Sequence, residues 1–226
     1  MRNLKILSLA LMAALAMSAM VASAAQGSVE PKLTSATTYP LTLHGEQLAT
    51  GNSFTAPLGT GTGIVCSKGT FDGLATLNGP ALAAEFTPTY EGCKSENGLF
   101  VTVTHNGCKF KFYDLTTSSA HYKATTDLIC PPEKQIEVHV YLFSGHTFPV
   151  CTLDMAEQKG LPGATVTNQA GGHVLLEGTI TGIKYTVTNG STESCKNGTY
   201  TDGVYHANVT LKGKDHLGNP VPIHVK

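Results

Sequence analysis

Runs in which apolar and polar residues alternate are the feature that most constrains the fold of this chain. In "QIEVHVYL" (135–142) every second residue is Ile, Val or Leu, and in "YHANVTLK" (205–212) every second residue is Tyr, Ala, Val or Leu. Side chains of a β-strand alternate between two faces, so each run predicts a strand with one buried and one solvated face. Turn residues recur about every ten positions, and helical periodicity is absent after residue 24. This pattern predicts an all-β fold: an antiparallel β-sandwich, or a partly open barrel, of short strands.

The segment "LFVTVTHNGCKFKFYD" (99–114) carries a strong turn signal. Asn106-Gly107 is a favoured pair for a two-residue type I′ turn. A hairpin about this turn places the apolar residues of both arms on one face, so turn chemistry and burial pattern agree. The predicted partners are His105 with Cys108, Val103 with Phe110, and Val101 with Phe112.

Two other segments bear on the organisation of the chain. In 173–190 the apolar positions change phase at Gly182, which predicts a β-bulge or a tight turn there. The only plausible helical turn lies near 153–160, and 156–165 is a possible subdomain boundary. We expect a single β domain over 25–226.

Six cysteines follow the first 24 residues, and an even number of exported cysteines indicates a disulfide framework. Six cysteines allow 15 connectivities. The cysteines of two pairs, Cys66–Cys93 and Cys108–Cys130, lie symmetrically on either side of a turn signal. If the chain folds back at each turn, antiparallel strands would bring the two sulfurs together. Zinc and redox sites use cysteines about two residues apart, whereas the closest here differ by 108 − 93 = 15 positions. We therefore expect about three structural disulfides, with a preference for Cys66–Cys93, Cys108–Cys130 and Cys151–Cys195.

The first 24 residues have the layout of a signal-peptide helix. Arg2 and Lys5 precede an apolar run, and Ala22-Ser23-Ala24 supplies small residues for cleavage. We expect cleavage after Ala24 and export to the extracellular space or the cell envelope. The alternative, a retained anchor helix, fits this short run less well. No later run is long and apolar enough for a membrane helix, so we expect no membrane insertion after signal removal.

Charge and composition exclude some partners. Loss of Arg2 and Lys5 leaves 13 bases against 16 acids, a net charge of 13 − 16 = −3. Arg2 is the only arginine and tryptophan is absent. Because arginine is the usual bidentate ligand of phosphate, nucleic acid is not an expected partner.

No motif identifies a catalytic or cofactor-binding residue, and no cofactor is expected. The candidate metal ligands are His206 and His224, which would meet if the last two strands paired. Solvated strand histidines are the simpler interpretation. A glycosidase needs two opposed carboxylates. The possible residues are Glu133, Glu137 and Asp154. Ser144 lies near His146, but a catalytic triad is recognised in space and not by adjacency in sequence.

Several short segments resemble a group of uncharacterised secreted actinobacterial proteins. They are "IVCSKGTFDG" (64–73), "YEGC" (90–93), "NGCKFKF" (106–112), "ICPP" (129–132) and "CTL" (151–153). The similarity covers roughly the middle half of the chain. It implies an exported, disulfide-bearing β fold and no particular activity.

These observations favour a non-catalytic exported β protein with a structural or binding role. One alternative is a carbohydrate-binding or small-ligand-binding module, for which Tyr113, Tyr141 and Tyr185 could supply the aromatic platform. The other is a secreted hydrolase of an unrecognised family. A glycan or an envelope component is the partner that the binding role would imply.

Overall fold

The computed structural model describes residues 31–35, 41–48, 53–56, 63–75, 84–118, 121–190 and 195–226. Every regular element in these ranges is a β-strand, which confirms the predicted all-β class. Within the same ranges no helix has the length and apolarity to cross a membrane. The expected signal peptide and its cleavage site at Ala24 lie outside the described residues.

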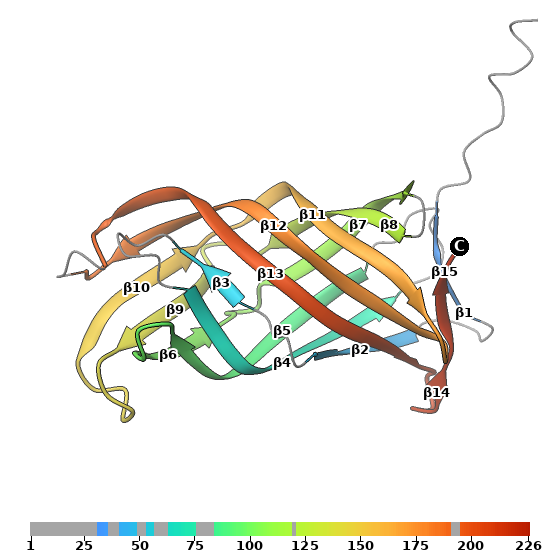
Figure 1. The fold of residues 1–226 in the computed structure, drawn as a ribbon, viewed down its shortest axis with the longest axis horizontal. Coiled ribbons are helices and arrows are strands. Elements are labelled where there is room, and N and C mark those ends of the chain that lie inside the picture. Colours follow the sequence, from blue (N-terminus) through green and yellow to red (C-terminus); the bar gives the residue numbers. More distant parts are fainter. Residues whose placement is uncertain are drawn as a thin grey trace, which may run out of the picture.

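The strands close into an eight-stranded antiparallel barrel, so the predicted sandwich or partly open barrel is wrong (Figure 1). Four long strands run through the wall. They are β4 (Gly63–Ala75), β5 (Ala84–Ser95), β12 (His173–Thr188) and β13 (Gly198–Lys214).

Each of the other four positions in the wall is filled by two strands lying end to end. For example, β2 and β3 both pair with β4 and with β13, and β6 and β7 both pair with β5. We call the level at which such pairs meet the mid-barrel break. The pairs are β2 (Leu41–Gln47) and β3 (Ser53–Thr55), β6 (Phe100–Thr104) and β7 (Lys109–Ser118), β8 (His121–Ile129) and β9 (Ile136–Tyr141), and β10 (Pro149–Met155) and β11 (Gln158–Gln169).

With each pair taken as one strand, the barrel is an up-and-down meander. Every strand lies beside its neighbours in sequence, and β13 closes the ring by pairing with β2 and β3. In the β13–β2 ladder, Val209 lies opposite Gln47 and Lys214 opposite Thr42. Alternation suits a barrel as well as a sandwich. The two differ in whether the first and last strands pair, which the local pattern does not encode.

The barrel interior is filled by the inward side chains that the alternation predicts. In β9, Ile136, Val138 and Val140 are buried, and in β13 Val209 and Leu211 are buried. The phase change at Gly182 is confirmed as a bulge, because its φ is 76° and the register between β12 and β13 shifts between Thr181 and Ile183. The largest fully buried side chains are Tyr185, Phe86, Leu41, Leu43, Leu153, Ile180 and Ile223.

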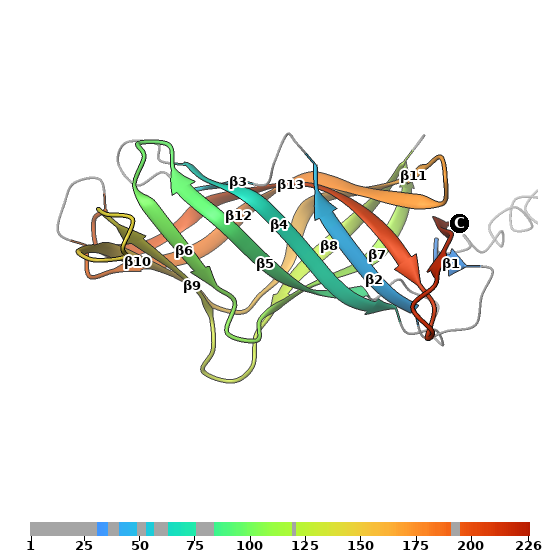
Figure 2. The same cartoon turned by 90° about the horizontal axis from the view of Figure 1, so that it is seen from below.

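The Asn106-Gly107 turn is present, but the hairpin predicted around it is wrong. Both residues have positive φ, 48° and 83°. In this fully described stretch β6 pairs with β5 and β9, while β7 pairs with β5 and β8. The chain therefore leaves the wall at the turn and re-enters it beside the same strand, β5; this is the smaller, green protrusion between β6 and β7 in Figure 2. Val103 pairs with Val138, and Phe110 pairs with Leu128 on one side and Phe86 on the other.

The helical turn predicted near 153–160 is also wrong. These residues form the end of β10, a short link and the start of β11. Burial explains the difference, because Leu153, Met155 and Leu161 all face the barrel interior. Residues 156–165, the possible subdomain boundary, lie in the wall of this barrel.

One end of the barrel is capped by strands from both ends of the described chain. A two-stranded sheet, β1 (Leu33–Ser35) with β15 (Ile223–Val225), lies across this end, beside β14 (Pro220–Val221), which pairs with β13 (Figure 1). The Asn168 amide bonds Val225 N and O, at 2.7 and 2.8 Å. Ile223 and Val225 are fully buried, so the cap completes the core.

All six cysteines are paired, which confirms the expectation of three disulfides. Cys66–Cys93 joins opposite residues of β4 and β5, and Cys108–Cys130 links the start of β7 to the end of β8 at the mid-barrel break. These are also the pairs that the symmetry about turns favours, with Cα separations of 3.8 and 4.1 Å. The third, Cys151–Cys195, joins β10 to the residues before β13, with a Cα separation of 6.1 Å. Three disulfides are compatible with an extracellular or otherwise oxidising compartment.

Replacing both Cys108 and Cys130 by serine should lower the free energy of unfolding by about 3 kcal/mol. The bridge closes a loop of sequence separation 22, and its loss frees that loop in the unfolded chain. Urea unfolding followed by circular dichroism measures the change. Because Cys151–Cys195 closes a longer loop, with a separation of 44, its double serine variant should lose at least as much. An unchanged urea midpoint in the Cys108/Cys130 variant would contradict this prediction.

Candidate functional site

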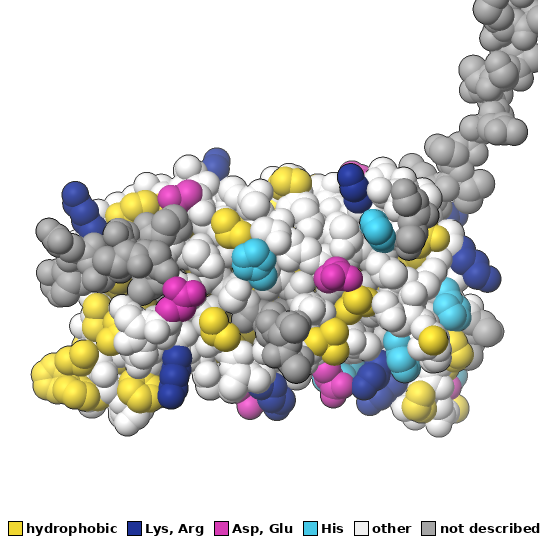
Figure 3. All heavy atoms as spheres, viewed as in Figure 1, with side chains coloured by type: hydrophobic (Ala, Val, Ile, Leu, Met, Phe, Trp, Pro, Cys, Tyr) yellow, Lys and Arg dark blue, Asp and Glu magenta, His cyan; other side chains and the backbone are white. Residues whose placement is uncertain are grey.

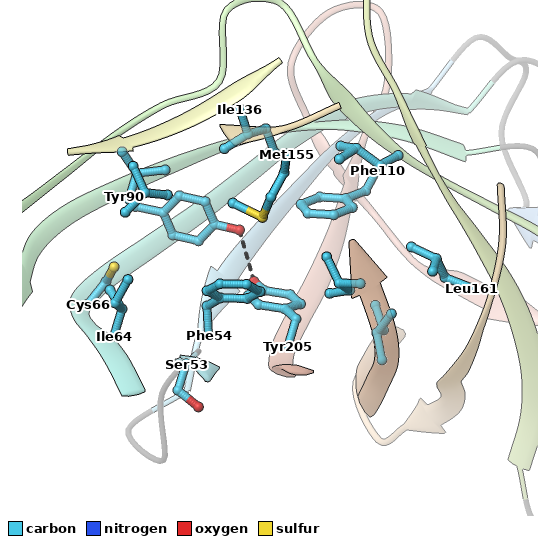
Figure 4. A pocket seen from close by; sticks show the side chains of 15 residues that line it. Ser53, Phe54, Ile64, Cys66, Tyr90, Phe110, Ile136, Met155, Leu161 and Tyr205 are labelled. Carbon is cyan, nitrogen blue, oxygen red and sulfur yellow. Dashed lines mark hydrogen bonds between the residues drawn. The ribbon is translucent and has the colours of Figure 1, made fainter. Parts of the chain in front are cut away.

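An apolar cavity of about 60 Å³ lies inside the barrel at the mid-barrel break (Figure 4). Six lining side chains come from strands that begin or end at the break. They form three successive pairs along the chain: Val103 and Phe110, Leu128 and Ile136, and Met155 and Leu161. The cavity therefore lies at the level where the two strands of each end-to-end pair meet.

The other side of the cavity is formed mainly by the long strands. Ile64 of β4 and Ile180 and Ile183 of β12 contribute aliphatic side chains, and Phe54 of β3 adds a ring. The Ser53 hydroxyl points away from the centre of the group in Figure 4. The lining is thus almost entirely hydrocarbon.

Two tyrosine hydroxyls are the polar exception. Tyr90 of β5 and Tyr205 of β13 extend toward each other, and their hydroxyl oxygens are 3.0 Å apart (Figure 4). Both rings are held by aromatic neighbours. Phe71 meets Tyr90 edge to face at 5.9 Å, and Phe110 stacks on Tyr205 at 5.7 Å. The hydroxyl pair is therefore fixed in place within an apolar surrounding.

Burial raises the pKa of both tyrosines well above its ordinary value, because an apolar interior disfavours phenolate. The neighbouring Tyr90 raises the pKa of Tyr205 further. Both hydroxyls consequently keep their protons at physiological pH. A protonated tyrosine can donate one hydrogen bond and accept others.

Asp127 stabilises an irregularly paired part of the wall beside the cavity. The register between β8 and β11 shifts on both sides of Leu161, which leaves the start of β11 bulged. The Asp127 carboxylate accepts hydrogen bonds from Gly160 N at 2.7 Å and from the Tyr113 hydroxyl at 2.9 Å. This bond to the carboxylate raises the pKa of Tyr113. Asp127 thus ties β11 to β7 and β8 where the ladder is interrupted.

A second candidate site lies on the outer face of the wall. Glu137 of β9 and Asp154 of β10 are directly opposite residues, and the His139 ring contacts Glu137 Oε2 at 3.3 Å. Thr188 donates a hydrogen bond to Asp154 at 3.4 Å. Burial, followed by the charge of Glu137, raises the pKa of Asp154. A solvent-open hollow of about 320 Å³ adjoins Asp154. Sequence reasoning named both carboxylates, and the fold brings them together while leaving Glu133 in the β8–β9 loop.

The candidate metal ligands are not brought together by strand pairing. His206 is exposed on β13, where its Nδ1 lies 3.0 Å from Thr179 Oγ1. His224 is on β15, which pairs with β1 and not with β13. Among the described residues, no group of three or more His, Cys, Asp or Glu side chains is arranged to hold a metal ion.

The three tyrosines considered for a sugar platform do not share an exposed face. Tyr185 is buried, and its ring stacks on Tyr200 at 5.1 Å. Tyr113 bonds Asp127, and Tyr141 lies against His146 at 5.1 Å. Ser144 and His146 both lie in the β9–β10 loop, with no hydrogen bond between them.

The β9–β10 loop also carries an exposed apolar cluster at the end opposite the cap. Phe143 and Phe148 meet edge to face at 5.6 Å, and they and Leu142 are at least half exposed. The corresponding hydrophobic patch is visible at the lower left of Figure 3, whereas charges of both signs are scattered over the rest of that face.

Sequence reasoning did not identify Tyr90 and Tyr205 as a site. Tyr205 occupies an inward position of its alternating run, and a buried tyrosine usually finds a hydrogen-bond partner. The inward position of Tyr205 was therefore the sequence signal that could have indicated a buried hydrogen-bonded hydroxyl. Its partner is 115 residues away in sequence, so only the barrel closure brings the two together.

Comparisons with protein-family models, with curated proteins and with solved structures find no match for this chain. The geometry of the cavity therefore carries the functional argument.

The stability of the protein should fall as pH rises above about 10, the ordinary tyrosine pKa. The unfolded chain then loses the Tyr205 proton, while the folded chain, in which this pKa is raised, retains it. Each such tyrosine contributes a slope of about 1.4 kcal/mol per pH unit. Urea unfolding at pH values from about 9 to about 11 should show a shallower decline in Tyr205→Phe. Identical declines in both proteins would count against the buried hydroxyl.

The pKa of Asp154 should fall in Glu137→Gln but remain above its ordinary value, because burial is the larger cause and persists. Carboxyl-carbon NMR titration measures this pKa directly. Glu177→Gln, on the exposed face of β12, is the control and should leave the Asp154 pKa unchanged. A pKa that does not respond to Glu137→Gln would refute the interaction.

Proposed function

We propose that this protein is a non-catalytic, exported β-barrel that binds a small apolar molecule in its interior. The observation that carries the proposal is the apolar cavity at the mid-barrel break. Eight-stranded barrels have an interior that is either just filled by side chains or holds one small ligand. Here the space that the side chains leave unfilled is lined by hydrocarbon, which favours the binding of one small ligand.

The volume limits the ligand. The cavity, about 60 Å³, is smaller than an engineered cavity of about 150 Å³ that binds benzene. A molecule of a few heavy atoms fits the resting shape. Met155 lines the cavity and has a flexible, unbranched side chain, so it is the residue best suited to adapt to a larger guest.

Entry of the ligand requires local opening of the wall, and we expect this opening at the mid-barrel break. Strand ladders are interrupted there, so fewer backbone hydrogen bonds must be broken. The Asp127 bond to Gly160 and the Cys108–Cys130 bridge restrain the same region. We place the entrance at this level of the barrel.

The expected signal peptide and the three disulfides support a location outside the cytoplasm, in the medium or the cell envelope. Bridges and a closed ladder suit an uncontrolled environment, because they resist proteolysis and leave no open sheet edge. The secreted actinobacterial proteins that the sequence resembles are consistent with a bacterial origin.

Xenon, which enters dry apolar cavities, is the first probe of the proposal. In the whole protein, dissolved xenon should shift the Met155 methyl signal in a carbon–proton NMR spectrum and should saturate. Val138→Leu extends a side chain of the lining and should weaken binding severalfold. Val140→Leu alters the same strand outside the lining and should bind xenon normally. A wild-type spectrum unaffected by xenon would refute the proposal.

A second candidate function, hydrolysis of a glycosidic bond, is favoured by the opposed pair Glu137 and Asp154. Glycosidases combine a carboxyl group of raised pKa with a second carboxylate. Chromogenic glycosides test it: release of the chromophore should disappear in both Asp154→Asn and Glu137→Gln. We rank this candidate second because the pair lies on the outer face of the wall, beside a hollow that is open to solvent.

A further inference from the structure

We infer that the ligand of the cavity carries one uncharged hydrogen-bond acceptor, such as a ketone, aldehyde or ether oxygen, which the Tyr90–Tyr205 hydroxyl pair recognises. This inference rests on the proposed function and adds to it the chemical class of the ligand. It depends on a count of hydrogen-bond donors in the cavity.

The hydroxyl pair has one more donor than it uses. Tyr90 and Tyr205 together carry two hydroxyl protons, and one of them lies in the bond between the two oxygens. Among the described residues, that bond is the only hydrogen bond of either hydroxyl. Whichever tyrosine donates to the other, the second proton has no acceptor among the described protein groups, and leaving a donor unpaired in an apolar cavity is unfavourable. An acceptor on the ligand would satisfy it.

The surrounding side chains restrict the acceptor to an uncharged group. Among the described residues, the lining contains no Lys, Arg or His that could pair with a carboxylate or a phosphate. Burying an unpaired anion in such a site is far more costly than burying a neutral oxygen. The raised pKa of both tyrosines also keeps the donor proton in place.

The geometry of the pair suits recognition because it is set before a ligand arrives. Stacking on Phe110 and edge contact with Phe71 hold the two rings, and their strands belong to the closed ladder. A donor held in position loses little conformational freedom on binding. The rest of the lining would contact the apolar body of the ligand.

Acetone and 2-methylpropene form a matched pair of small probes, since they have nearly the same shape and differ in a carbonyl oxygen against a methylene group. NMR titration of the Met155 methyl signal should show that the wild-type protein binds both. Tyr90→Phe/Tyr205→Phe removes both tyrosine hydroxyls and should weaken ketone binding about threefold to tenfold, as expected for one neutral hydrogen bond. The alkene should not bind more weakly. Each single variant retains one donor and should keep most of the ketone affinity.

The infrared carbonyl stretch of bound acetone gives a readout independent of affinity. It should lie at lower wavenumber in the wild type than in the double variant, because a hydrogen bond weakens the carbonyl bond. Tyr185→Phe is the control, since this hydroxyl bonds Asp202 and its ring is outside the lining.

The outcomes separate the two proposals. If neither probe binds the wild type, the proposed function fails. If both bind but the double variant weakens them equally, or leaves the carbonyl stretch unchanged, the cavity stands and the recognition by the tyrosines is wrong.

Discussion

The hydrogen-bonded ladder between β13 and β2 is the constraint on which the rest of the structure depends. It joins residues more than 160 positions apart, Lys214 with Thr42 among them, and it removes the free edges that an open sheet of these strands would have. Closure also fixes the interior. Side chains from every strand must fill one enclosed space, and the cap formed by β1 and β15 completes that core at one end. The core is therefore the product of pairings between distant parts of the chain.

The mid-barrel break follows from the way this ring is built. Four wall positions are continuous, and four are assembled from two strands that meet halfway. At that level the interior receives side chains such as Phe110 and Ile136 from strands that are just beginning, and the packing leaves a dry space beside the Tyr90–Tyr205 pair. The site and the irregularity of the wall are thus one feature. The Cys108–Cys130 bridge and Asp127 hold the interrupted strands together around it.

Local chemistry was sufficient to predict the β-class, the inward residues of β9 and β13, the bulge at Gly182 and the presence of three disulfides. Each depends on a period of two, a glycine or a cysteine count, which are properties of neighbouring residues. The hairpin at Asn106-Gly107 was wrong because β5 and its neighbours compete for the two arms as pairing partners. The closed barrel and the hydroxyl pair were not foreseen, since both require contacts between residues separated by more than 100 positions.

The linking segments of the mid-barrel break have a consequence for how such a protein can diversify. Those after β6 and β8 protrude from the wall, so lengthening or shortening them need not disturb the ring. The same segments determine which side chains reach the interior at Val103, Phe110, Leu128 and Ile136. Insertions and deletions in these two segments could therefore change the shape of the cavity while the barrel wall stays the same. Evolution or protein engineering could obtain new ligand specificities from this barrel by changing the segments at the mid-barrel break and leaving the two ends of the barrel unchanged.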